Sequence, residues 1–317
     1  ADKEIRKGGS SGMKKKKINS NNLLLLITIV LFFVMYAAGC IVYADKGFTR
    51  FQTFLNILIN NAGLICITAG MTCVMLTGGI DISVGSVTAL VCMVLADLME
   101  NKGVNAYAAV LVALLIGVAF GIVQGFLVSY LEIQPFIVSL AGMFFGRGMT
   151  SIISTDMISI KNKTFLAWAN YKIYLPIGSY SRRGKFIPAY IYPTVIIAIL
   201  IFIVVLDGLL AGCGGFLFCL NSCSGFVEQA KGLEMDAISA SVIGGTLLSG
   251  GVGTPFGTVF GVLIKGTISS LITTQGTLSS WWVRIALSAL LCFFIVLRAL
   301  SCMTSVTCRC LFVFFLK

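Results

Sequence analysis

The sequence predicts an all-α, polytopic membrane protein with about eight to ten transmembrane helices, some of them broken or re-entrant, arranged in two related halves. Three observations predict this class. Hydrophobic residues make up 58% of the 317 residues and charged residues only 11%, whereas a soluble domain carries about 25% charged residues. Several apolar runs are long enough to cross a hydrocarbon layer of about 30 Å. Two glycine-rich segments interrupt such runs and share one spacing pattern.

The composition also narrows the classes of function. The net charge is +11, but most of the basic residues lie in the N-terminal stretch and in the loops at 46–50 and 161–185. That distribution is typical of membrane topology signals, so we expect contacts with lipid and no nucleic-acid partner. The chain has no histidine, which disfavours most hydrolases and metalloproteins. The 11 cysteines are scattered without zinc spacing, so no metal site is expected.

The chain divides into two tails and one membrane domain. Residues 1–22 are predicted to form a cytoplasmic N-terminal tail, in which 1–12 have the character of an appendage. The N-terminus is placed in the cytoplasm because four consecutive lysines precede the first apolar run, and positive charge favours the cytoplasmic side. Residues 23–298 are the predicted transmembrane domain, and 299–317 are an atypical C-terminal tail.

The expected helices follow in order along the chain. The run 190–220 is too long for one span and too short for two spans with a loop between them. The run 83–98 is only half a span, and the interval 155–188 is polar. The other expected helices are 23–44, 51–76, 106–131, 136–154, 253–273 and 281–298.

Small and amide side chains mark helix-packing faces in two of these runs. Gly117, Gly121 and Gly125 have the small-xxx-small spacing that lets a neighbouring helix approach closely. Asn60 and Asn61 lie beside Asn56 on one face of the run 51–76. Hydrogen bonds between helices are the favoured role for these amides, with a pathway-lining face as the alternative.

The segment 76–86, LTGGIDISVGS, interrupts a membrane-spanning run with glycines, hydroxyls and a carboxylate. Unpaired backbone and charge at membrane depth persist only where protein or water surrounds them, so we predict a broken helix. Segment 244–251 repeats its Gly-Gly-x-x-x-Ser-x-Gly skeleton, and paired interruptions of this kind point to a repeat-built transporter. The predicted hinges are Gly78, Gly79, Gly85, Gly244, Gly245 and Gly251.

Three stretches carry a family resemblance. They are GMTCVMLTGGIDISVGSVTAL at 70–90, EIQPFIVSLAGMFFGRG at 132–148 and LEMDAISASVIGGTLLSGGVGTPFGTVFGVLIKG at 233–266. They resemble the permease subunits of bacterial sugar ABC importers, the group that handles ribose, xylose, galactose and related sugars. LAGMFFGRG, GTLLSGGVGT and GTLSSWW are most similar to the galactofuranose-type members. The likeness covers about residues 20–206 and 208–298.

The resemblance implies a transport subunit and a set of partners. Two permease chains would form a channel across the bacterial inner membrane, an extracytoplasmic sugar-binding protein would deliver the sugar, and two cytoplasmic ATPases would drive the cycle. The permease itself would catalyse nothing and bind no cofactor, because ATP and magnesium belong to the ATPases. The chain agrees in lacking a phosphate-binding G-x-x-x-x-G-K-[ST] motif.

The chain departs from the family pattern in one place. Members carry a long basic cytoplasmic loop, with a coupling helix that docks on the ATPase, between the spans that match 195–205 and 209–220. Here Leu206-Asp207-Gly208 joins those spans directly. The chain is therefore expected to lack the coupling loop, through a deletion or an altered or wrongly read gene, and the C-terminal tail also lacks the family's polar character.

A neutral sugar requires hydroxyl and amide partners that bind weakly. For Asp81 a cap on the half-helix starting near Ser83 is favoured over direct sugar contact, and the same capping role is favoured for Thr246 and Ser249. For Asp236 a surface carboxylate and a pathway residue stay open. The candidate pathway residues are Asn60, Asn61, Thr77, Asp81, Ser83, Thr246 and Ser249.

Other functions fit parts of the sequence. The chain can be an importer subunit for a nucleoside, an autoinducer-like sugar or a branched-chain amino acid, since pathway residues do not fix the substrate. A membrane enzyme would need converging His, Asp or Glu residues at membrane depth, which the sequence does not offer. A non-transporting assembly protein is the remaining alternative, which the direct 206–208 junction makes less remote.

Overall fold

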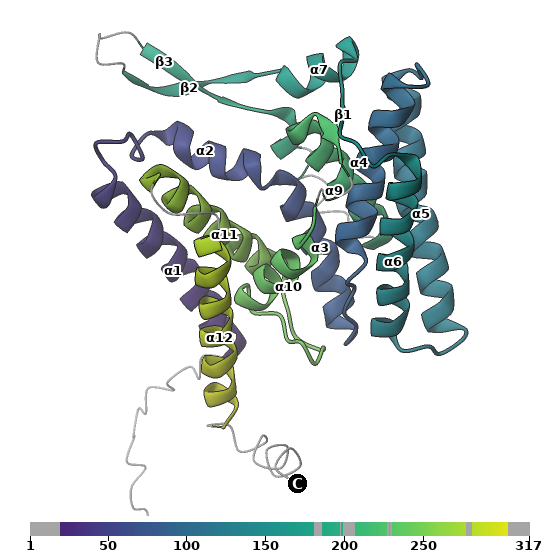
Figure 1. The fold of residues 1–317 in the computed structure, drawn as a ribbon. Helices are drawn as coiled ribbons and strands as arrows, with labels where there is room; N and C mark the ends of the chain where they lie inside the picture. The colour runs from purple at the N-terminus through teal and green to yellow at the C-terminus, as the bar shows by residue number, and fades with distance from the viewer. Residues whose placement is uncertain are drawn as a thin grey trace, which may run out of the picture.

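The computed structural model describes residues 20–180, 186–196, 198, 207–226, 228, 230–276 and 281–303. Helices dominate this part of the chain, and the strands form only two short antiparallel pairs (Figure 1). The predicted all-α membrane class is confirmed. The helices are α1 (Ser20–Val42), α2 (Phe51–Asn60), α3 (Ala62–Leu76), α4 (Val84–Glu100), α5 (Ala106–Ser129), α6 (Pro135–Ile153), α7 (Lys163–Asn170), α9 (Asp207–Ser222), α10 (Leu233–Ile243), α11 (Pro255–Gln275) and α12 (Trp281–Met303).

Four helices in the described residues are long and apolar enough to cross a membrane, namely α1, α5, α6 and α11. A fifth span results if α2 and α3, which meet at an angle of 54°, are counted as one. The run 51–76, expected as one helix, is therefore bent at Asn61. Residues 199–206 lie outside the described part, so the total of eight to ten spans stays a prediction.

The polar interval at 155–188 forms the cap seen at the top of Figure 1. It contains α7 and the hairpin of β2 (Ile173–Tyr180) with β3 (Phe186–Ile191). Gln52 of α2 fastens this hairpin, because its amide accepts from the Tyr190 N–H at 2.8 Å and donates to the Tyr190 carbonyl at 3.1 Å. A second pair, β1 (Ile158–Ser159) with β4 (Ser224–Gly225), lies beside α4.

The core is built on α3 and α4, which are buried on nearly every side. Both are apolar all round, as expected for helices that contact protein in every direction. In contrast, α1, α5 and α6 expose large apolar side chains such as Phe33, Leu111, Ile122 and Phe144. Outer surfaces of this kind suit lipid rather than water. The architecture is therefore that of a multi-pass membrane protein.

Helices α10 and α11 pack with their backbones in direct contact. A Cβ atom at Gly261 would collide with the Ala240 carbonyl oxygen, and one at Gly257 with the Gly244 carbonyl oxygen. The close packing predicted for the helix that contains Gly257 and Gly261 is confirmed. Gly244 is needed for this approach and not for an unusual turn, since its φ is −67°.

Buried hydroxyls join the helices of the core. Thr72 of α3 lies 2.7 Å from the Thr258 hydroxyl of α11 and donates to the Ser241 hydroxyl of α10 at 3.3 Å. Thr28 of α1 donates at 2.8 Å to the carbonyl of Ile243, the last residue of α10. Such bonds hold helices together where no water competes for them.

Candidate functional site

The predicted break lies between α3 and α4. Helix α3 ends because Gly78 takes a left-handed conformation, with φ at +82°, a region that glycine enters without steric cost. The chain then runs without helical structure to Ser83, and α4 begins at Val84. Two bonds close the end of α3: the Thr77 hydroxyl donates to the Val74 carbonyl at 2.7 Å, and the Gly79 N–H donates to the same carbonyl at 3.1 Å.

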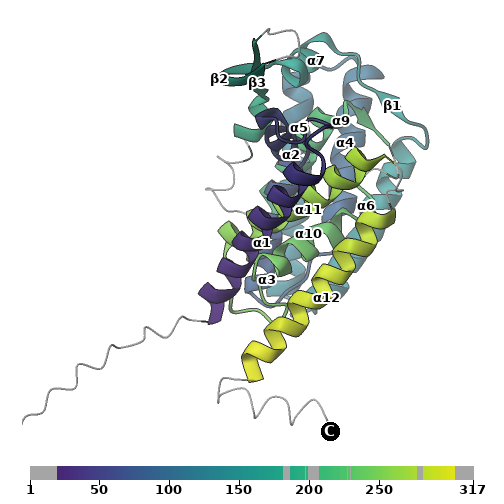
Figure 2. The same cartoon turned by 90° about the vertical axis from the view of Figure 1, so that its left-hand side faces the viewer.

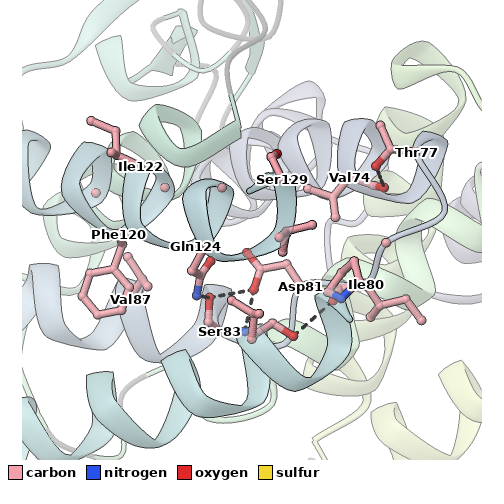
Figure 3. Close-up of a pocket in the computed structure, with 18 of the residues that line it drawn as sticks. Val74, Thr77, Ile80, Asp81, Ser83, Val87, Phe120, Ile122, Gln124 and Ser129 are labelled. Carbon is pink, nitrogen blue, oxygen red and sulfur yellow. Dashed lines mark hydrogen bonds between the residues drawn. The ribbon is translucent and has the colours of Figure 1, made fainter. Parts of the chain in front are cut away.

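Asp81 and Ser83 hold the start of α4. One Asp81 carboxylate oxygen accepts from the Ser83 N–H at 2.8 Å and from the Ser83 hydroxyl at 2.6 Å. This is the side-chain-to-backbone turn that a capping role requires. Gln124 of α5 donates to the Ser83 hydroxyl at 2.9 Å. These three side chains therefore form a hydrogen-bonded chain from the break to α5 (Figure 3).

A cavity of about 560 Å³ opens beside this chain, between the break, α5 and α6. Its walls are mostly apolar, and Figure 3 shows the side chains of Asp81, Ser83 and Gln124 gathered at one side of it. On the α6 side, Ser139 donates to the Ile80 carbonyl at 3.1 Å. The lining residues with polar side chains are Thr77, Asp81, Ser83, Gln124, Ser129 and Ser139.

This lining can exchange hydrogen bonds but offers no covalent chemistry. A carboxylate accepts, an amide both donates and accepts, and hydroxyls do both. The carboxylate of the lining, Asp81, accepts from both the N–H and the hydroxyl of Ser83 and so holds the turn at the start of α4. No group of three metal-ligating side chains occurs among the described residues. The site suits weak, reversible contact with a small polar solute.

The structure places four of the predicted pathway and hinge residues at the cavity: Thr77, Gly79, Asp81 and Ser83. Asn60 and Asn61 lie elsewhere. Asn61 is buried at the bend between α2 and α3, where its amide donates to the Ile57 carbonyl at 2.8 Å. Its side-chain amide also lies against Gly266 of α11, where an added Cβ atom would collide with it. Asn61 therefore packs between helices, while its hydrogen bond goes to a carbonyl of the preceding turn.

The second glycine-rich segment contacts the first rather than lining the cavity. The Gly251 N–H donates to the Leu76 carbonyl at 2.9 Å, and a Cβ at Gly250 would lie 2.8 Å from Gly78. Gly245, Gly250 and Gly251 all have φ between +80° and +99°. The two segments with the shared skeleton therefore meet at one place, although none of 244–251 reaches the cavity.

The capping role expected of Thr246 and Ser249 is wrong. Thr254 begins α11 instead, and its hydroxyl accepts from the Gly257 N–H at 3.3 Å. Thr246 is buried beside Gly253, and its hydroxyl has no hydrogen-bond partner in the part of the chain that is described. Ser249 is exposed at the turn. The residues 244–254 lie outside α10 and α11, so α11 begins at Pro255.

Gly85 acts by close approach and not as a hinge. A Cβ there would collide with the Glu234 carboxylate of α10, and it would lie 3.0 Å from the Ala230 carbonyl oxygen. One oxygen of Glu234 is buried without a hydrogen-bond partner among the described residues. The carboxylate lies at the first turn of α4, where the helix dipole favours negative charge.

Helices α5 and α6 contribute lining residues that were not predicted from the sequence. Gln124, Ser129 and Ser139 line the cavity, as do Gly117, Gly121 and Gly125. Close packing was expected of these glycines, but at Gly125 it is wrong, because a Cβ there would meet nothing within 4 Å. A lone amide in an otherwise apolar run was the available signal for Gln124.

The comparisons with known proteins agree with this picture. Residues 53–206 and 194–296 match a family described as branched-chain amino acid transport system / permease component. The chain belongs to this family of permeases. It is therefore a membrane transport subunit and not an enzyme, as predicted.

Among individual relatives, the inner membrane ABC transporter permease protein YjfF of Escherichia coli is 37% identical over 281 residues, covering 80% of this chain and 85% of the relative. The fructose import permease protein FruG of Bifidobacterium longum is 28% identical, covering 79% and 84%. The autoinducer 2 import system permease protein LsrC of Yersinia pestis is 29% identical, covering 75% and 74%. No solved structure matches the chain. The chain is a multi-pass inner-membrane protein.

Proposed function

We propose that this chain forms the translocation pathway of an ATP-driven importer for a monosaccharide. The observation that carries the proposal is the set of relatives named for fructose and autoinducer 2 import, which match the chain over most of its length. The partners would be a second permease chain, cytoplasmic ATPases that bind ATP and magnesium, and an extracytoplasmic sugar-binding protein. The N-terminus would lie in the cytoplasm.

The cavity at the broken helix supports a neutral solute. Its lining contains hydroxyls, one amide and one carboxylate, and no lysine or arginine. An amino acid would bring a carboxylate that requires a cation or several N–H donors. The family description names branched-chain amino acids, yet a cavity with its own carboxylate and no basic side chain favours a sugar over that class of substrate.

The contact between sugar and cavity would be transient. Asp81 and Gln124 already satisfy Ser83, so a sugar hydroxyl gains only the remaining acceptor and donor positions. A site of this kind orients a passing solute without trapping it, which conduction requires. Substrate choice would then belong mainly to the binding protein.

Uptake of a radiolabelled monosaccharide tests the proposal. The chain would be produced together with a candidate ATPase and a candidate binding protein from the same organism, in cells that lack their own importer for that sugar. We expect ATP-dependent uptake that requires all three components. Uptake of leucine but of no sugar would overturn the proposal in favour of the amino acid class.

A missing coupling loop is part of the proposal. The family match falls into two ranges that overlap at 194–206 instead of one continuous range. The alignment with YjfF is 281 positions long but covers only 80% of the 317 residues of this chain. The alignment is longer than that share of the chain, so YjfF has residues without a counterpart here. Both findings support a missing segment, and the overlap of the two family ranges favours a place just before α9, whose first residue is Asp207.

Restoring the loop tests this part. A coupling loop from a relative, inserted between Leu206 and Gly208, should increase retention of the ATPase in a detergent pull-down by about tenfold, because docking of a helix into a groove supplies most such affinity. A polar linker of equal length is the control and should change nothing. Full retention of the ATPase by the chain as it stands would show that no essential loop is missing.

A further inference from the structure

Lys265, at the middle of α11, forms an ion pair with Asp236 of α10. Lys265 Nζ lies 3.0 Å from an Asp236 carboxylate oxygen. Lys265 is the eleventh of the 21 residues of α11, which places it about 15 Å from either end of a helix that rises about 1.5 Å per residue. That is the centre of a hydrocarbon layer about 30 Å thick.

Within the part of the chain that the structure describes, this ion pair is partly exposed. The Lys265 side chain is 19% exposed and the Asp236 side chain 31% exposed. Charged side chains at this depth face the interior of an assembly or a water-filled space, because lipid solvates them poorly. The exposed side of the pair therefore requires water or protein in the assembled transporter.

Further polar side chains extend from the pair along the same helix faces. Ser269 and Thr273 follow Lys265 at intervals of four residues, and Ser239 follows Asp236 by three, so each set lies on one side of its helix. Ser239 and Ser269 are partly exposed and Thr273 is exposed. We call Ser239, Asp236, Lys265, Ser269 and Thr273 the α10–α11 polar stripe.

The stripe differs from the outer faces of α5 and α6. The exposed side chains there are large and apolar, including Leu111 at 60% and Phe144 at 66% exposure. Figure 2 shows α10 and α11 beside each other on the side of the molecule that α1 and α12 flank, with α6 farther back. The two surfaces therefore differ in the surroundings that stabilise them: lipid suits the outer faces of α5 and α6, and a polar medium suits the stripe.

We propose that the α10–α11 polar stripe faces water in the assembled transporter and lines the aqueous route of a polyhydroxylated solute. The second part rests on the proposed function, whereas exposure of the stripe to water does not. The paired charges of Asp236 and Lys265 cancel at a distance, so the stripe offers hydrogen bonds to a neutral solute without a strong net field.

Thiol labelling tests the exposure to water. Ser269→Cys and Ser239→Cys variants of the full chain would be treated in membrane vesicles with a charged, membrane-impermeant thiosulfonate, and labelling would be read by site-resolved mass spectrometry against the native cysteines. Leu111→Cys and Phe144→Cys are the matched controls, since both replaced side chains are exposed and apolar and Phe144 lies at the middle of α6. We expect the stripe positions to react at least about tenfold faster than the controls, because only a hydrated thiol ionises readily.

Equal labelling rates at the stripe and at Leu111→Cys would overturn the proposal. Oxidative cross-linking of Ser269→Cys between two copies of the chain, together with no labelling by the impermeant reagent, would overturn it as well, because a second copy would then cover the stripe in place of water. Vesicles that also contain the ATPase and the binding protein test the route: charged adducts at Ser269→Cys should reduce sugar uptake at least about tenfold relative to the unmodified variant. Rapid labelling with unchanged uptake would overturn the route alone, and absence of uptake in the unlabelled parent would instead contradict the proposed function.

Discussion

The break between α3 and α4 and the break between α10 and α11 share one glycine skeleton but differ in what surrounds them. At the first, Gly78 turns the chain and Asp81, Ser83 and Gln124 form a hydrogen-bonded edge of a cavity. At the second, Gly244 packs against Gly257, and the loop that follows lies on Gly78. The skeleton thus encodes an interruption of a helix, and the neighbouring helices decide whether that interruption borders a cavity or a tight contact.

The largest expected loss of stability distinguishes a glycine in the contact between α10 and α11 from a glycine that lines the cavity. Gly261→Ala places a methyl group against the Ala240 carbonyl oxygen, and we expect a loss of about 3 kcal/mol of stability, because backbone cannot move aside cheaply. Gly125→Ala is the matched control, since its methyl group meets nothing within 4 Å. Thermal unfolding in detergent measures both, and equal melting temperatures would show that α10 and α11 are not in direct contact.

The next effect concerns Asp81. Asp81→Ala removes the acceptor for the Ser83 N–H and hydroxyl, and we expect a loss of about 1–2 kcal/mol of stability together with reduced uptake. Asp81→Asn keeps an oxygen in the same place and should retain most uptake if the role is to hold the turn. Loss of uptake in Asp81→Asn at unchanged melting temperature would make Asp81 a direct contact of the sugar instead.

Gln124 gives a smaller effect that is specific to the first break. Gln124→Leu removes the donor to Ser83 while leaving the bond from Ser83 to Asp81, so stability should fall by only about 1 kcal/mol. The rate of uptake should fall by a larger factor than this small change in stability explains, because the side-chain amide of Gln124 is lost from the cavity lining. Val123→Leu on the exposed face of α5 is the control. Uptake equal to that of the control would remove Gln124 from the pathway.

The smallest effect tests where α11 starts. Thr254→Ala should cost about 1 kcal/mol, the usual effect of removing a helix cap, because Thr254 accepts from the Gly257 N–H. Ser249→Ala should change the melting temperature little, since Ser249 is exposed and outside the helix. A larger loss of stability in Ser249→Ala than in Thr254→Ala would instead show that Ser249 caps the helix, as the shared glycine skeleton predicts.

Local signals determined much of the first break. Gly78 enters the left-handed region without steric cost and so ends α3, and a carboxylate two residues before Ser83 forms a turn that needs no distant partner. The same reasoning placed the cap of α11 wrongly, because Gly250 and Gly251 turn to reach Gly78 and Leu76. That contact joins residues more than 170 positions apart and has no local signature.

By itself, the sequence determined that this chain is a helical membrane protein with two interrupted helices, because hydropathy and glycine placement act over a few neighbouring residues. Only the tertiary structure decided which polar residues meet. Gln124 reaches Ser83, Asn61 turns away into a bend, and Lys265 pairs with Asp236. The physical reason is that helix packing sets these distances, through side-chain volumes and backbone approach across the whole bundle, and neither quantity is recorded in the spacing of residues along one helix.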